Sequence, residues 1–87
     1  MKCYILSYDL VYQRNYEPLW TAIRSYPNWA KITESTWAIV TDKSAAEIRD
    51  HLSRYMDSDD RIFIVKSGTE SAWRNVICKS EWLQTNL

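Results

Sequence analysis

The first ten residues alternate between bulky apolar side chains and smaller or polar ones. This period of two predicts a β-strand that presents different residues on its two faces. The bulky face carries Tyr4, Leu6, Tyr8 and Leu10, and the smaller face carries Cys3, Ile5, Ser7 and Asp9. The strand therefore ends on a carboxylate, just after a run that is expected to be buried.

Helical spacing follows over residues 16–26, where Pro18 suits a first helical turn and Pro27 predicts the helix end. Aromatic and β-branched residues predict an antiparallel hairpin over 28–33 and 35–41, with its turn near Glu34. Ser44 and Glu47 have the spacing of a capping box at the start of a second helix. The predictions that complete the chain are a strand over 61–66 and a short helix or arm over 80–87.

The predicted order is strand, helix, strand, strand, helix, strand. This order is typical of an α+β, ferredoxin-like βαββαβ sandwich, a four-stranded antiparallel sheet with two helices on one face. We assign residues 1–66 to this domain and residues 67–87 to a C-terminal extension that packs on the domain or on a dimer partner. Since both helices cover one face of the sheet, we expect a second copy of the chain to cover the other.

The composition is typical of a single small domain that associates with another chain. The chain has 87 residues, of which five are Trp and six are Tyr, and large aromatic residues favour interfaces. Eleven basic residues balance eleven acidic ones, which disfavours a strongly basic nucleic-acid binder but permits a local basic face. Cys3 and Cys78 are expected to be free thiols. The first residues are too short an apolar run for a signal peptide, and no stretch reaches the roughly 18 apolar residues of a membrane span, so we expect a cytoplasmic protein without membrane contact.

Asp9 is the leading candidate for chemistry, because a carboxylate beside a buried strand must be paired, solvated or metal-bound. In one interpretation Asp9 caps the following loop or pairs with Arg14. In the other it is a hard oxygen ligand for Mg²⁺, which binds few carboxylates at a time. A two-fold axis would supply two copies of Asp9, assisted by Ser7 or water, and the ion would then activate water for phosphodiester cleavage.

Other candidates are weaker. His51 is expected to be a solvated or half-buried helical residue, and the acidic stretch 57–60 to be a solvated turn. No phosphate-binding glycine loop, dinucleotide fingerprint or zinc-ligand spacing is present. The candidate nucleic-acid contacts are Arg14, Arg24 and Lys31, for which the alternative is ordinary solvated surface charge.

The Tyr8-Asp9 strand end, the Ser35-Thr36-Trp37 segment and the order of elements resemble the CRISPR-associated Cas-two family. The resemblance is closer to its stand-alone, SinR-labelled relatives, and VapD-type ribonucleases share the arrangement. It covers roughly residues 1–66. The resemblance implies a ferredoxin-like homodimer with facing sheets, in which Asp9 takes the position of the family's proposed metal-binding aspartate. Ser35 and Trp37 take the positions of its serine-and-aromatic motif.

Two functions follow as expectations. The first is a Cas-two-like homodimer associated with RNA or DNA, with metal-dependent endoribonuclease activity at a shared Asp9 pair. The alternative is a non-enzymatic adaptor of the same fold that binds a protein partner through its aromatic residues, which the neutral overall charge favours. A ligand bound between aromatic rings at the dimer seam is a third interpretation, supported only by the number of aromatic residues.

Overall fold

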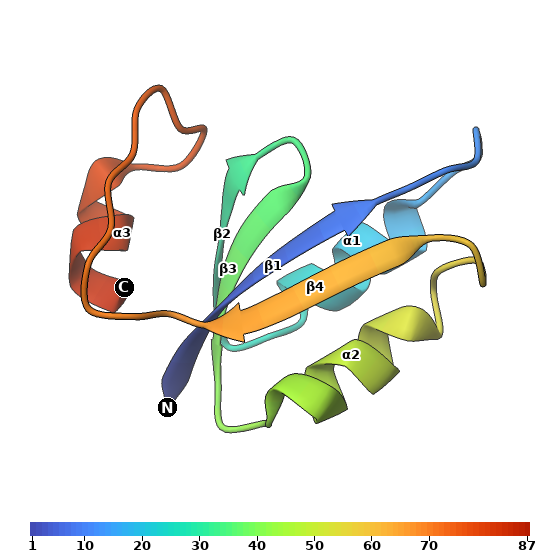
Figure 1. The fold of residues 1–87 in the computed structure, drawn as a ribbon, viewed down its shortest axis with the longest axis horizontal. Coiled ribbons are helices and arrows are strands. Elements are labelled where there is room, and N and C mark those ends of the chain that lie inside the picture. Colours follow the sequence, from blue (N-terminus) through green and yellow to red (C-terminus); the bar gives the residue numbers. More distant parts are fainter.

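The computed structural model describes all 87 residues as four strands and three helices (Figure 1). No helix is both long and apolar enough to cross a membrane. The elements are β1 (Lys2–Asp9), α1 (Glu17–Arg24), β2 (Asn28–Thr33), β3 (Thr36–Thr41), α2 (Ala45–Ser53), β4 (Arg61–Lys66) and α3 (Ser80–Asn86).

The four strands form one sheet in the order β2-β3-β1-β4, and all neighbouring strands are antiparallel. On β1, Leu6 lies opposite Trp37 of β3 and Ile64 of β4. α1 and α2 lie together against one face of the sheet (Figure 1). The predicted ferredoxin-like α+β arrangement is therefore confirmed.

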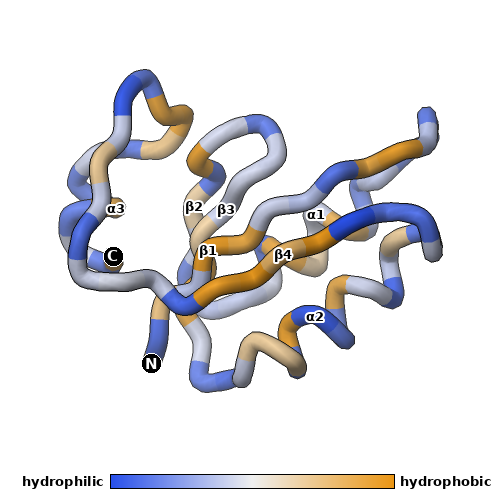
Figure 2. The backbone as a smooth tube through the Cα atoms, in the orientation of Figure 1, coloured by the Kyte–Doolittle hydropathy of each residue, from blue (hydrophilic) through white to orange (hydrophobic).

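The core lies between this face and the two helices. Leu6 is fully buried at the centre of β1, and Leu19 and Ile48 are fully buried on α1 and α2. The alternation seen in the sequence places the bulky face of β1 inward, because Tyr4 and Tyr8 belong to the same buried cluster. Figure 2 shows the corresponding apolar stretches along the central strands and β4. The residues on the smaller face of β1 consequently point away from α1 and α2.

Local signals account for the helix ends. The capping box of α2 is confirmed, because the Ser44 side chain accepts from the Glu47 N–H and the Glu47 carboxylate accepts from the Ser44 N–H. α1 ends two residues earlier than predicted. Its last turn tightens, since Ser25 and Tyr26 donate to carbonyls three residues back before Pro27 redirects the chain.

The C-terminal segment returns along the outer side of β2, away from α2 (Figure 1). The Ile77 N–H donates to the Ile32 carbonyl at 2.9 Å, and the Trp82 indole donates to the Asn28 side chain at 3.0 Å. Leu83 of α3 is only 1% exposed. These contacts place α3 over the β2 side of the outer sheet face, because Asn28 lies in register with Val40 on that face.

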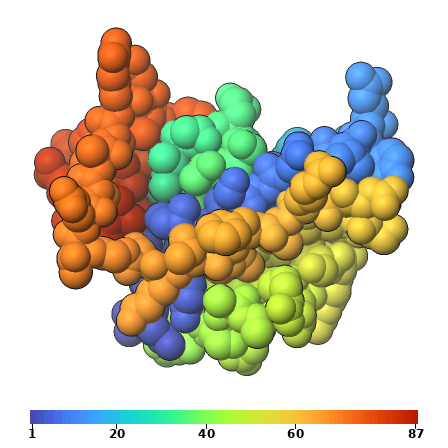
Figure 3. Space-filling view, in the orientation of Figure 1, coloured from blue at the N-terminus to red at the C-terminus, as the bar shows by residue number.

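The β1 and β4 side of the same face has no cover. Phe63 is 65% exposed and Val65 is 45% exposed, although both belong to a regular strand. β4 also forms one edge of the sheet, and it crosses the front of the molecule without a segment above it (Figure 3). We call this region the open sheet face, and its residues are Ile5, Ser7, Asp9, Arg61, Phe63 and Val65.

Candidate functional site

Asp9 lies at the end of β1 on the open sheet face, beside Ser7 in a shallow hollow of about 160 Å³. Its Oδ2 atom accepts a hydrogen bond from Arg61 Nη1 at 2.8 Å. The partner is thus Arg61 and not Arg14, because Asp9 and Arg61 stand directly opposite each other in the β1–β4 register. The side chains are 67% and 72% exposed, and no group of the chain hydrogen-bonds Asp9 Oδ1, so that oxygen faces solvent.

The three candidate nucleic-acid contacts lie on three different segments, and each has an acidic partner. Arg14 Nε lies 3.0 Å from Asp57 Oδ2, and its guanidinium covers the Tyr16 ring. Arg24 pairs with Glu17 along α1, and Lys31 Nζ lies 3.5 Å from Glu34 on the β2–β3 hairpin.

The acidic turn before β4 has a structural role that the sequence did not indicate. The Asp60 carboxylate accepts from the N–H groups of Val11 and Asp57, both at 2.8 Å, and from the Tyr16 hydroxyl at 2.9 Å. Burial alone would raise the pKa of Asp60, but these hydrogen bonds and the Arg14 charge outweigh it and lower the pKa. The turn was expected to be simply solvated; instead it fixes the loop between β1 and α1.

Two of the residues that carried the family resemblance, Tyr8 and Trp37, meet in the core. The Tyr8 N–H donates to the Ser35 carbonyl at 3.1 Å. The indole N–H groups of Trp20 and Trp37 both donate to the Tyr8 hydroxyl at 3.0 Å. That hydroxyl in turn donates to the Glu34 carbonyl at 3.2 Å. Tyr8 and Trp37 therefore join the first strand to the hairpin and to α1, which gives this part of the motif a packing role.

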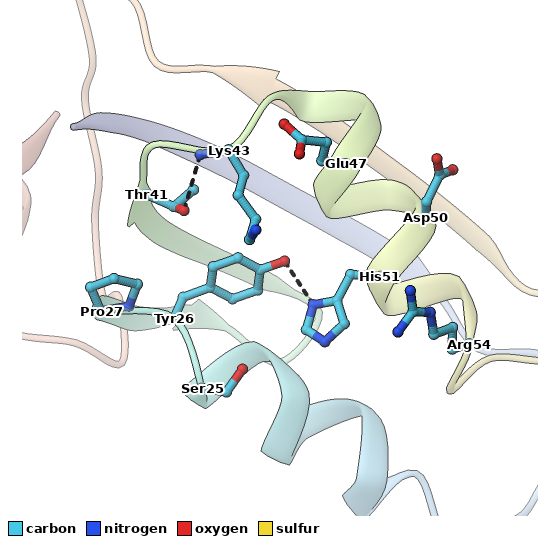
Figure 4. Close-up of a pocket in the computed structure, with 9 residues that line it drawn as sticks. All are labelled: Ser25, Tyr26, Pro27, Thr41, Lys43, Glu47, Asp50, His51 and Arg54. Carbon is cyan, nitrogen blue, oxygen red and sulfur yellow. Dashed lines mark hydrogen bonds between the residues drawn. The ribbon is translucent and has the colours of Figure 1, made fainter.

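A second polar region lies on the helical side of the sheet, where the end of α1 meets α2 (Figure 4). The Tyr26 hydroxyl lies 2.8 Å from His51 Nδ1, and the ring of Tyr55 meets the His51 ring edge-on. His51 is half-buried, as the sequence predicted. Its partner Tyr26 could not be assigned from sequence, because the two residues lie 25 positions apart and meet only after α2 docks.

Within one chain the donor chemistry at Asp9 suits Mg²⁺, but the number of ligands is too small. No group of three or more His, Cys, Asp or Glu side chains is close enough to hold a metal ion. The free Asp9 oxygen and the Ser7 hydroxyl are hard oxygen donors, and a second pair would be needed beside them. Both cysteines are free thiols, as predicted. No protein-family model matches this chain.

Proposed function

We propose that this protein is a Cas-two-like homodimer associated with nucleic acid, in which two open sheet faces meet and bring two copies of Asp9 together. The observation that carries the proposal is the exposure of Phe63 and Val65 beside Ile5, on the same uncovered face as Asp9. Contiguous exposed apolar side chains mark interaction surfaces. The edge strand β4 adds unpaired backbone groups to the same region.

A dimer across this face would double the oxygen donors. Two Asp9 carboxylates and two Ser7 hydroxyls would then hold Mg²⁺ with water completing its shell. The ion would supply charge neutralisation at a phosphodiester and a more acidic bound water. Arg61 would remain beside Asp9, where a guanidinium can contact a phosphate oxygen through two hydrogen bonds.

The dimer is tested by light scattering during size-exclusion chromatography at micromolar concentration. We expect a dimer for the wild type and a monomer for Phe63→Lys, because a buried charge without a partner disrupts an apolar contact. Ile77→Lys is the matched control, since Ile77 is 55% exposed but lies outside the open sheet face. A wild-type monomer, or equal dissociation by both variants, would contradict the proposal.

The nuclease step is tested with labelled single-stranded RNA in the presence of Mg²⁺ or EDTA. We expect cleavage that needs Mg²⁺ and is lost in Asp9→Asn. Asp42→Asn is the control, because Asp42 is also an exposed carboxylate at the end of a strand but lies at the other end of the sheet. Equal cleavage by wild type and Asp9→Asn would remove Asp9 from the mechanism.

A second candidate is a non-enzymatic adaptor that uses the same face to bind a protein. It is favoured by the ion pair that already engages Asp9 and by the acidic partners of Arg14, Arg24 and Lys31. A mobility-shift titration with RNA and DNA at low salt separates the two. Binding that weakens steeply with added salt supports the nucleic-acid function, and no binding supports the adaptor.

A further inference from the structure

A hollow with mostly polar lining residues lies between the end of α1, the end of β3 and α2, on the face opposite the proposed dimer contact. Its volume is about 510 Å³, which is within the range of small-molecule sites. Figure 4 shows that the Lys43 ammonium extends toward the Tyr26 hydroxyl and that the His51 ring stands between Tyr26 and Arg54. Three basic side chains thus converge from two different segments of the chain.

Two of these cations, Lys43 and Arg54, form no direct ion pair. The six ion pairs of the structure include neither Lys43 nor Arg54. Two acidic residues line the same hollow; Asp50 is paired outside it, whereas the charge of Glu47 acts on Lys43. Asp50 pairs with Arg49 at 3.0 Å, and Glu47 accepts the Ser44 N–H at 3.0 Å at the start of α2. With Asp50 paired to Arg49, the other charged side chains of the hollow are Lys43, Arg54 and Glu47, so the hollow keeps a small excess of positive charge.

His51 adds directed hydrogen-bonding capacity to this charge. Its Nδ1 atom is held 2.8 Å from the Tyr26 hydroxyl, while its Nε2 atom has no hydrogen-bond partner in the chain. Tyr26 is only 6% exposed, so the ring nitrogen is anchored by a buried group. Burial lowers the pKa of His51, and the positive charges of Arg54 and Lys43 lower it further. An anion between these groups would relieve their mutual repulsion.

A second hollow continues from the first along the groove between α1 and α2. It has a volume of about 520 Å³ and shares Ser25 and His51 with the first. Its other lining residues include Thr21 and Asn15, which offer hydrogen bonds without further positive charge, and Glu17, whose carboxylate is paired with Arg24. A ligand with one anionic end and a polar uncharged body would span both hollows.

We propose that the groove between α1 and α2 binds a phosphate monoester, with its phosphate held by Lys43, Arg54 and His51. The organic part of the ligand occupies the neighbouring hollow beside Thr21. The same chemistry is presented by a free nucleotide and by the 5′-phosphate of an oligonucleotide. This site is independent of Asp9 and of the proposed dimer.

The first test is a titration of ¹⁵N-labelled protein with inorganic phosphate, followed by NMR at the amides around Lys43 and His51. We expect saturable shifts there, and an increase of about tenfold in Kd for Lys43→Gln and for Arg54→Gln, which corresponds to about 1.4 kcal/mol each. Lys66→Gln is the control, because Lys66 is also exposed and unpaired but lies at the end of β4. Both test positions are exposed, so the variants should fold.

Two results would overturn the proposal. One is an absence of shifts at these amides up to about 10 mM phosphate, well above the concentration at which a millimolar site saturates. The other is equal weakening by Lys66→Gln, which would indicate general charge attraction. If phosphate binds, AMP and a 5′-phosphorylated dinucleotide are compared with adenosine and the 5′-hydroxyl dinucleotide. Of AMP and the phosphorylated dinucleotide, the one that binds more tightly shows whether the site takes a free nucleotide or the 5′ end of an oligonucleotide.

The contribution of His51 is tested with sulfate, which stays a dianion over the pH range used. Affinity should rise as the pH falls below about 6.5, the ordinary pKa of histidine, because the pKa of His51 is lowered and its ring gains a proton only in that range. His51→Gln should remove this rise, and a rise that persists in His51→Gln would exclude His51 as the titrating group. Burial and the charge of Glu47 raise the pKa of Tyr26, and hydrogen bonds to Ser44 lower the pKa of Glu47, so neither changes charge there. The charged or titratable groups around His51 are Glu17, Tyr26, Lys43, Glu47, Asp50, Arg54 and Tyr55.

Discussion

The Tyr8 hydroxyl joins three separate segments of the chain through a single oxygen atom. It accepts hydrogen bonds from the indoles of Trp20 and Trp37 and lies within hydrogen-bond distance of the Glu34 carbonyl. Tyr8→Phe removes this oxygen with almost no change in side-chain shape. The Trp37 indole is 2% exposed, so its N–H would be left without a partner in the core.

The size of the effect follows from the burial of the two indoles. Leaving a buried donor unpaired costs about 1–3 kcal/mol. Trp20 is half-buried and can be hydrated, so it adds only about 0.5–1 kcal/mol, the value of an ordinary hydrogen bond. The two terms add to about 1.5–4 kcal/mol, and from the middle of this range we expect Tyr8→Phe to lower the free energy of unfolding by about 2–3 kcal/mol. For a domain of this size this corresponds to a fall of roughly 10–20 °C in Tm.

Urea unfolding followed by tryptophan fluorescence and by circular dichroism measures this change. Tyr4→Phe is the matched control, because Tyr4 is 4% exposed on the same face of β1 and its hydroxyl makes no hydrogen bond within the chain. We expect Tyr4→Phe to change stability by less than about 0.5 kcal/mol, as for a substitution that breaks no hydrogen bond. If the two variants lose the same stability, the hydroxyl does not contribute as the structure implies.

Three further predictions concern single contacts. Ser44→Ala should lower the free energy of unfolding by about 1 kcal/mol in urea, because it removes the capping box of α2; no loss would mean that the cap is not formed in solution. Leu83→Ala should cost about 2–5 kcal/mol in urea, because Leu83 is 1% exposed, whereas a fully separate tail would lose nothing. The pKa of Asp60 is lower in the folded state than in the unfolded state. The ionised carboxylate therefore adds its full share to the free energy of unfolding above the unfolded pKa of about 3.9, and this share is lost as the pH falls through the lower pKa of the folded state. Asp60→Asn should therefore be less stable than wild type at neutral pH, and its free energy of unfolding should fall less between about pH 4 and pH 2. Parallel curves of unfolding free energy against pH for the two proteins would contradict this.

The sequence predicts the fold well where the relevant forces are local. The alternation in β1 determines which residues enter the core, and the Ser44 and Glu47 spacing locates the start of α2. The α1 boundary differs because the last predicted residues adopt a tighter turn before Pro27. Such differences arise from backbone geometry at a helix end, where several hydrogen-bond patterns have similar energies.

The side-chain partners of the candidate sites depend on contacts between distant segments. Asp60 and Val11 lie 49 positions apart, and Arg61 and Asp9 lie 52 positions apart. A carboxylate followed five residues later by Arg14 suggests a local pair, but the β1–β4 register brings Arg61 closer. Periodicity identifies the face on which Asp9 lies, whereas its partner follows only from the register.

The Asp9–Arg61 ion pair contributes too little to the stability of the fold to explain why either residue is present. Both side chains are about two-thirds exposed or more, and such surface pairs contribute little, about 0–1 kcal/mol. The pair can therefore open at small cost when a ligand or a second chain approaches. The adjacent Phe63 is more informative, since a bulky apolar side chain that stays 65% exposed on a regular strand gains little from folding as a monomer. If the open sheet face becomes buried in a dimer, the Asp9–Arg61 pair loses its solvent. Its charges then matter far more, because the effective dielectric falls. The role of Asp9 thus depends on what covers Phe63.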